Sequence, residues 1–98
     1  MTRALEFHPA AAEDLLAASV YYATIRSSLG ATFVDRVEVA VSRAWQAPLT
    51  GSPVSANLRR IFVRRFPYSV IFAVEDARIF IVAVAHFRRR VGFWRERI

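Results

Sequence analysis

Cysteine and lysine are both absent from this chain of 98 residues, and glycine occurs only three times. Without cysteine there is no disulfide framework, no thiolate nucleophile and no thiolate ligand for a metal. The two histidines, His8 and His86, lie far apart in the sequence and are a poor basis for a zinc site. Redox chemistry and structural metals are therefore excluded, and we expect neither a metal nor a cofactor.

Long apolar segments are missing as well. No run approaches the roughly eighteen residues that a membrane crossing requires. The N-terminal stretch MTRALEFHP also lacks the apolar centre of a signal peptide. We therefore expect a cytoplasmic protein without a membrane partner. The length is enough for one sheet and one layer of helices, which predicts a single domain over residues 1–98.

All fourteen basic residues are arginine, and their distribution is uneven. Residues 1–57 carry four arginines and five acidic residues, a net charge of −1, whereas residues 58–98 carry ten arginines and three acidic residues, a net charge of +7. The planar guanidinium binds phosphates and carboxylates through two parallel hydrogen bonds. Biased genomic composition also produces arginine-only chains. The charge predicts an anionic or acidic partner for the C-terminal half.

The chain is apolar for its size: 55% of its residues are hydrophobic and its mean hydropathy is +0.28. Such a composition indicates either a generous core or an apolar surface that another chain covers. We therefore expect a partner protein or an oligomer.

The first half of the chain predicts one strand and two helices. Residues 3–8 alternate apolar and polar side chains up to Pro9, which indicates a strand followed by a helix with proline in its first turn. Helical spacing then runs over about residues 10–26, is broken by SSLG, and resumes from about residue 29 to 47, before Pro48. Two consecutive helices form an antiparallel hairpin.

The second half changes to a period of two, which is typical of strands. Three strands are expected at residues 58–66, 68–75 and 78–87, after an irregular loop at residues 48–57. The order β-α-α-β-β-β predicts an α+β fold, with the helical hairpin on one face of a four-stranded, mostly antiparallel sheet. The other face of that sheet would be available to a ligand or partner.

The candidate site residues lie on these strands and after them. The strand at residues 58–66 carries arginines on both faces, which favours an edge position or frayed ends: Arg59, Arg60, Arg64 and Arg65. Alternation on the last strand places Phe80, Val82 and Val84 on one face with His86 and Arg88. The segment AHFRRRVGFWRER at residues 85–97 adds further candidates for contact with a target: Arg89, Arg90 and Trp94.

The sequence resembles the RelE/ParE superfamily of toxins from type II toxin-antitoxin systems. The resemblance covers nearly the whole chain: ALEFHPAAAEDLLAASVYY, LGATFVDRVEVAV, LRRIFVRRFPYSVIFAV and IVAVAHFRRRVGFW. Its most specific parts are R-x-F-P-Y, ending at Tyr68, and AHFRR. The resemblance implies a growth inhibitor of the kind linked to plasmid stabilization, neutralised in a hetero-oligomer by a cognate antitoxin.

Two branches of this superfamily differ in target, and the resemblance leaves both open. ParE-like members bind DNA gyrase, and the H-x-R segment formed by His86 and Arg88 resembles theirs, so we favour this branch; its contacts would be Trp94 and the C-terminal arginines. RelE-like members are ribosome-dependent endoribonucleases that cleave mRNA. Here Arg60, Arg65 and Arg88 would hold phosphate and His86 would transfer protons.

The catalytic set of the RelE-like branch is incomplete in this sequence, which has no lysine and no tyrosine after Tyr68. An inactive toxin or a nucleic-acid-binding module is the third alternative. In every case we expect a flexible antitoxin tail whose acidic residues pair with the arginines.

Overall fold

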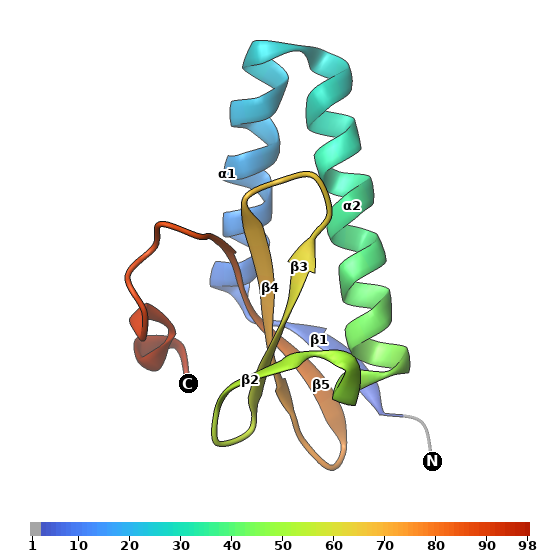
Figure 1. Cartoon of the computed structure of the whole chain (residues 1–98), viewed down its shortest axis with the longest axis vertical. Coiled ribbons are helices and arrows are strands. Elements are labelled where there is room, and N and C mark those ends of the chain that lie inside the picture. The colour runs from blue at the N-terminus through green and yellow to red at the C-terminus, as the bar shows by residue number, and fades with distance from the viewer. Residues whose placement is uncertain (1–2) are drawn as a thin grey trace.

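The computed structural model describes residues 3–98, and its elements follow the expected order β-α-α-β-β-β with one additional strand (Figure 1). The sheet order is β1-β5-β4-β3-β2, in which β1 runs parallel to β5 and all other neighbours are antiparallel. The α+β class is confirmed. The elements are β1 (Ala4–Phe7), α1 (Pro9–Ile25), α2 (Ser27–Gln46), η1 (Pro48–Thr50), β2 (Ser52–Ser55), β3 (Leu58–Val63), β4 (Tyr68–Val74), β5 (Arg78–His86) and η2 (Phe93–Arg97).

The sheet has five strands, whereas the sequence predicts four. The additional strand β2 lies in the segment expected to be a loop and pairs antiparallel with β3. Arg59 strengthens this pairing because its Nη1 donates a hydrogen bond of 2.7 Å to the Gly51 carbonyl. The expectation of an edge position for β3 is therefore wrong for Leu58–Arg60, which pair with β2, whose short sequence SPVS lacks the apolar alternation that reveals a strand. The alternative of a frayed end is confirmed, because β3 stops at Val63 and leaves Arg64 and Arg65 outside the strand.

The two helices form the expected hairpin, but their connection is shorter than SSLG predicts. Arg26 alone separates them, in an extended conformation with φ −162°, and α2 already begins at Ser27. Gly30 lies within α2 where the two helices approach closely: an added Cβ would lie 2.8 Å from the Ser19 carbonyl oxygen and 2.9 Å from the Ala23 Cβ.

No helix within residues 3–98 combines the length and apolar character needed to cross a membrane.

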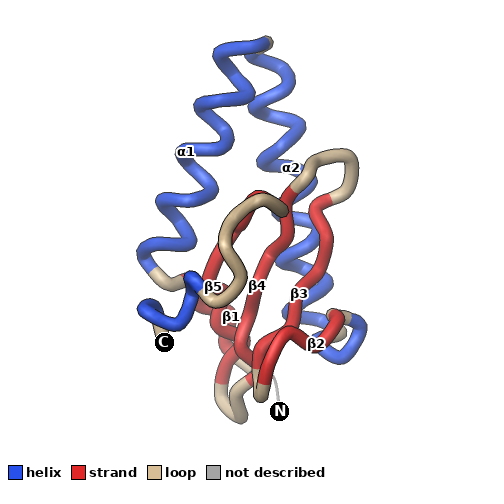
Figure 2. The backbone as a smooth tube through the Cα atoms, turned by 60° about the vertical axis from the view of Figure 1, so that its left-hand side comes forward, coloured by secondary structure: helices blue, strands red, loops and turns tan. Residues whose placement is uncertain are grey.

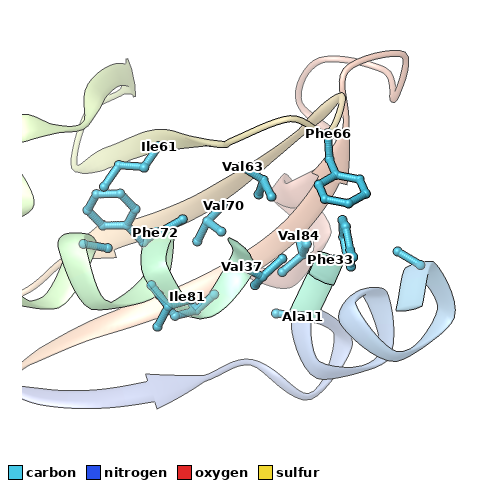
Figure 3. Close-up of a cluster of buried hydrophobic side chains, with 14 of the residues drawn as sticks. Ala11, Phe33, Val37, Ile61, Val63, Phe66, Val70, Phe72, Ile81 and Val84 are labelled. Carbon is cyan, nitrogen blue, oxygen red and sulfur yellow. The ribbon is translucent and has the colours of Figure 1, made fainter. Parts of the chain in front are cut away.

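Both helices pack on one face of the sheet (Figure 2). The core between the two layers combines several alanines of the helices with larger side chains from both the helices and the strands. Phe33 and Phe72 are its largest fully buried side chains. Figure 3 shows the cluster, which includes Ala11, Val37, Ile61, Val63, Phe66, Val70, Ile81 and Val84.

A bulge in β5 changes which side chains share a face. The ladder pairs Ile71 with Ala83 but Phe72 with Ile81, so Val82 is an extra residue that reverses the alternation. The expectation that Phe80, Val82, Val84 and His86 share one face is therefore wrong. Val84 joins the core under the helices, whereas Val82 joins a second cluster on the opposite face.

The C-terminal segment covers part of the sheet face that the helices leave open. Trp94 of η2 is buried there, and it packs in the second cluster with Leu58, Ile71, Ala73, Val82, Ala83 and Ala85. Figure 2 shows this segment crossing the sheet on the side away from the helices. The chain therefore forms three layers at this point, with the sheet in the middle.

Candidate target-binding surface

One end of the sheet carries a group of exposed arginines. The turn between β3 and β4 lies against the chain that follows β5, because the N–H of Phe87 donates a hydrogen bond of 2.9 Å to the Pro67 carbonyl. Four arginines of these two segments are exposed, and their side chains make no hydrogen bond or ion pair within residues 3–98: Arg64, Arg65, Arg88 and Arg90. We call these four side chains the basic end.

Besides Arg89, whose contact with Asp14 is longer at 3.5 Å, three other arginines of the C-terminal half form hydrogen bonds or ion pairs within the protein. Arg59 bonds to the Gly51 carbonyl, so this predicted target contact is at least partly occupied. Arg78 pairs with Glu75 at 2.6 Å and with Glu6 at 2.9 Å, and these hydrogen bonds raise the pKa of its guanidinium. The third is Arg97. Only part of the charge of residues 58–98 is therefore free to meet a partner.

Arg97 and Asp14 form a clamp at the β5 bulge. The Arg97 guanidinium donates to both carboxylate oxygens of Asp14, at 2.6 and 3.1 Å, and to the Val82 carbonyl at 3.0 Å. Asp14 also accepts the N–H of Val84 at 3.1 Å. Strand β1 pairs with β5 only as far as Ile81. The Arg97–Asp14 pair provides hydrogen-bond partners for two backbone groups beyond that point, the Val82 carbonyl and the Val84 N–H. The sequence offers no signal for this contact between residues 83 positions apart.

His86 lies at the end of β5, opposite Tyr68 in the ladder, with 5.1 Å between the two ring centroids. Its Nδ1 accepts a hydrogen bond of 3.0 Å from the backbone N–H of Arg88. Because an amide N–H can only donate, the neutral ring carries its proton on Nε2. The lone pair on Nδ1, which a general base would need to accept a proton, is therefore already occupied by this hydrogen bond.

The residues proposed for catalysis are only partly brought together. His86 and Arg88 line one hollow with Tyr68 and Tyr22, whose hydroxyl pKa values are both raised by burial. Arg65 does not line this hollow. It lies in the turn after β3, not on the strand, and has a φ of 72°, a left-handed conformation that is rare for a residue with a side chain.

A second concavity lies on the helix-free face, between β3 and the C-terminal segment. It has a volume of about 270 Å³, and Arg60, Arg89, Ser69 and Trp94 are among its lining residues. Trp94 is only 8% exposed, so its indole lines this pocket and offers little surface to a target protein. The described residues 3–98 contain no group of three or more His, Cys, Asp or Glu side chains that could hold a metal ion.

Comparisons with known proteins agree on one family. Residues 5–91 match the family described as ParE toxin of type II toxin-antitoxin system, parDE. Toxin ParE2 of Mycobacterium tuberculosis, from both the CDC 1551 and H37Rv strains, is 37% identical over 90 residues, which cover 88% of this chain and 83% of the relative.

A solved structure also shares the fold. The chain from the structure titled "Chromosomal ParDE TA system from P. aeruginosa" has a TM-score of 0.76 at 21% sequence identity, and the match covers 87% of this chain and 96% of that one. At 21% identity, this similarity establishes a shared fold and nothing about function. The family match and the Mycobacterium relatives extend it to the protein's role: this chain belongs to the ParE toxin family of type II toxin-antitoxin systems.

Proposed function

We propose that this toxin inhibits DNA gyrase by binding it, without cleaving a substrate. The observation that carries the proposal is the state of His86, whose Nδ1 is held by the N–H of Arg88. Cleavage of RNA through its 2′-hydroxyl requires a base and an acid. A histidine that presents only an N–H can bind and orient a partner, but it is poorly placed to remove a proton.

The basic end is the surface proposed to meet the target. Its four guanidiniums are free within the described residues, so each can form paired hydrogen bonds with a carboxylate of gyrase or a phosphate of its bound DNA. Arg65 is held there in a left-handed turn, a strained conformation of the kind that gathers at functional sites. Exposed charges of this kind are screened by salt, so binding should weaken as ionic strength rises.

The antitoxin is proposed to cover the same end and the adjoining outer side of α1. This helix carries apolar side chains on the side away from the sheet, and Leu16, Val20 and Ile25 are each at least 55% exposed. A flexible tail with apolar residues for α1 and acidic residues for the arginines would bury this surface. Neutralisation then follows because toxin bound in this way has no free basic end.

A supercoiling assay with purified gyrase tests the proposal. The full-length toxin, released from its antitoxin complex and refolded, should inhibit supercoiling. The double variant Arg88→Gln, Arg90→Gln should need about tenfold more protein, since each lost charged contact weakens binding markedly. The matched control Arg36→Gln, Arg43→Gln removes the same charge from α2 and should inhibit like the unaltered toxin.

Two results would contradict the proposal. The first is undisturbed supercoiling at a large excess of folded toxin. The second is cleavage of mRNA on ribosomes that disappears in His86→Ala, because it would restore the catalytic roles of His86, Arg65 and Arg88.

A further inference from the structure

The pocket on the helix-free face has the features of an anion site. Its floor includes Ser69, which is 4% exposed and whose hydroxyl makes no hydrogen bond within residues 3–98. No fully enclosed side-chain nitrogen or oxygen among these residues lacks a partner. The unbonded hydroxyl therefore reaches the open space of the pocket, where it is free to bind a ligand.

Two arginines from different elements line the pocket together with Ser69. Arg60 on β3 lies over the Phe62 ring, at 5.2 Å, and forms no hydrogen bond through its side chain within residues 3–98. Arg89 stacks on Phe93 at 4.0 Å and reaches Asp14 only at 3.5 Å, because Arg97 occupies that carboxylate at shorter distances. No Asp or Glu is among the residues that line the pocket. The site is therefore cationic and retains free donors.

We infer that this pocket binds the phosphate group of a nucleotide. Donors from two walls and the floor suit a tetrahedral anion with several oxygens, whereas one guanidinium already satisfies a planar carboxylate. An aromatic surface adjoins the donors: Phe62 and Phe87 are 57% and 55% exposed, with ring centroids 5.5 Å apart. Exposed rings beside arginines are surfaces on which a base stacks.

The pocket goes beyond what the family match assigns. Its wall formed by Phe93 and Trp94 lies outside residues 5–91, which match the ParE model. The binding of phosphate is also independent of the gyrase proposal, because it is measured on the toxin alone. The phosphate can come from a free nucleotide or from a nucleic-acid strand, and the experiment separates these two sources.

Trp94 fluorescence reports on the pocket directly. The chain has two tryptophans, and in a Trp45→Phe background only Trp94 remains. The refolded full-length protein is titrated with inorganic phosphate, thymidine monophosphate, a short oligothymidylate and a glutamate-rich peptide. A saturable change is expected with the phosphate-bearing probes. Equal affinity for the nucleotide and the oligomer identifies a free nucleotide as the source, and tighter binding of the oligomer identifies a strand.

Three variants in this background locate the site. Arg60→Gln and Ser69→Ala should each weaken binding by about fivefold to tenfold, since the first removes a cationic guanidinium and the second a hydroxyl donor to the anion. Arg43→Gln removes one positive charge from α2 and should leave the affinity unchanged. Far-ultraviolet circular dichroism verifies that Ser69→Ala, which removes one oxygen atom from the pocket, is folded.

Three results would overturn the inference. One is the absence of a saturable change with every phosphate-bearing probe. Another is equal weakening by Arg43→Gln and Arg60→Gln, which would indicate diffuse attraction to the whole basic chain. The third is binding of the glutamate-rich peptide alone, which would make the pocket a carboxylate site.

Discussion

Removing Arg97 from its clamp with Asp14 should destabilise this protein far more than removing a comparable arginine at the surface. The side chains of Arg97 and Asp14 are only 12% and 11% exposed, and the Arg97→Gln substitution leaves the carboxylate without its main partner. It also frees the Val82 carbonyl, to which Arg97 donates. Both losses occur at the point where the C-terminal segment is fastened to β5.

The size of this loss in the free energy of unfolding follows from the burial of the two side chains. Breaking a buried ion pair by removing one partner costs about 3 to 5 kcal/mol. The lower value applies here, because the C-terminal segment can lift away and admit water to Asp14. A loss of about 3 kcal/mol is a large part of the 5 to 15 kcal/mol that typically stabilises a domain. At about 4 to 8 °C per kcal/mol, it lowers the melting temperature by roughly 12 to 24 °C.

Urea unfolding followed by circular dichroism measures this loss. The control is Arg78→Gln on β5, which removes an arginine whose partners Glu6 and Glu75 are 52% and 38% exposed, so the midpoint should move much less. The N–H of Val84 donates a hydrogen bond to the Asp14 carboxylate. In Asp14→Asn the acceptor is a neutral amide oxygen, which binds a proton donor more weakly, so hydrogen exchange of the Val84 amide should accelerate.

A double-mutant cycle completes the experiment. The Asp14→Asn, Arg97→Gln double variant should lose much less than the sum of the two single variants, since each single variant leaves one unpaired buried charge and the double variant leaves none. Equal midpoints for Arg97→Gln and Arg78→Gln, together with additive losses in the double variant, would show that the Arg97–Asp14 pair contributes no more than a surface ion pair.

Three further predictions concern the helices, the tyrosines and His86. Gly30→Ala should destabilise by about 1 to 3 kcal/mol in urea titrations, because its Cβ would lie 2.8 Å from the Ser19 carbonyl oxygen; an unchanged midpoint would mean that the helices separate freely. Burial raises the pKa of Tyr22 and Tyr68 above 10, so the folded state keeps protons that the unfolded state releases. The contribution of these tyrosines to the free energy of unfolding should therefore be fully present below pH 10 and be lost as the pH rises above it. In urea unfolding curves recorded across that pH range, Tyr68→Phe should show a smaller loss. His86→Ala, which keeps the basic end, should retain toxicity in a growth assay if the protein still folds and binds antitoxin; loss of toxicity there would favour catalysis.

The repeating patterns of the sequence were sufficient to predict most of the fold. Period two and helical spacing each act over many residues, so the helical hairpin and the three long strands were found. The same patterns could not reveal β2, because four residues containing serine and proline carry little alternation. They could not reveal the extra residue Val82 either, since a bulge depends on pairing with β4 and leaves no local signature.

The candidate site was predicted less completely, for a related reason. The charge of the C-terminal half indicated a basic surface, but it could not separate arginines with internal partners, such as Arg59 and Arg97, from free ones. Those partners lie on elements brought together only by the tertiary fold. Ser69 was missed because a single serine within an apolar strand has no pattern, and the pocket above it forms only when the C-terminal segment crosses the sheet.

Whether this ParE-family toxin acts by binding gyrase, as proposed above, is tested most directly by controlled expression in a bacterium, with and without the cognate antitoxin, while DNA damage signalling and global translation are followed in parallel. If the toxin binds gyrase, a DNA damage response should begin while translation is intact, and the antitoxin should abolish it. Translation that collapses first, with mRNA cleaved at ribosomes, would contradict it.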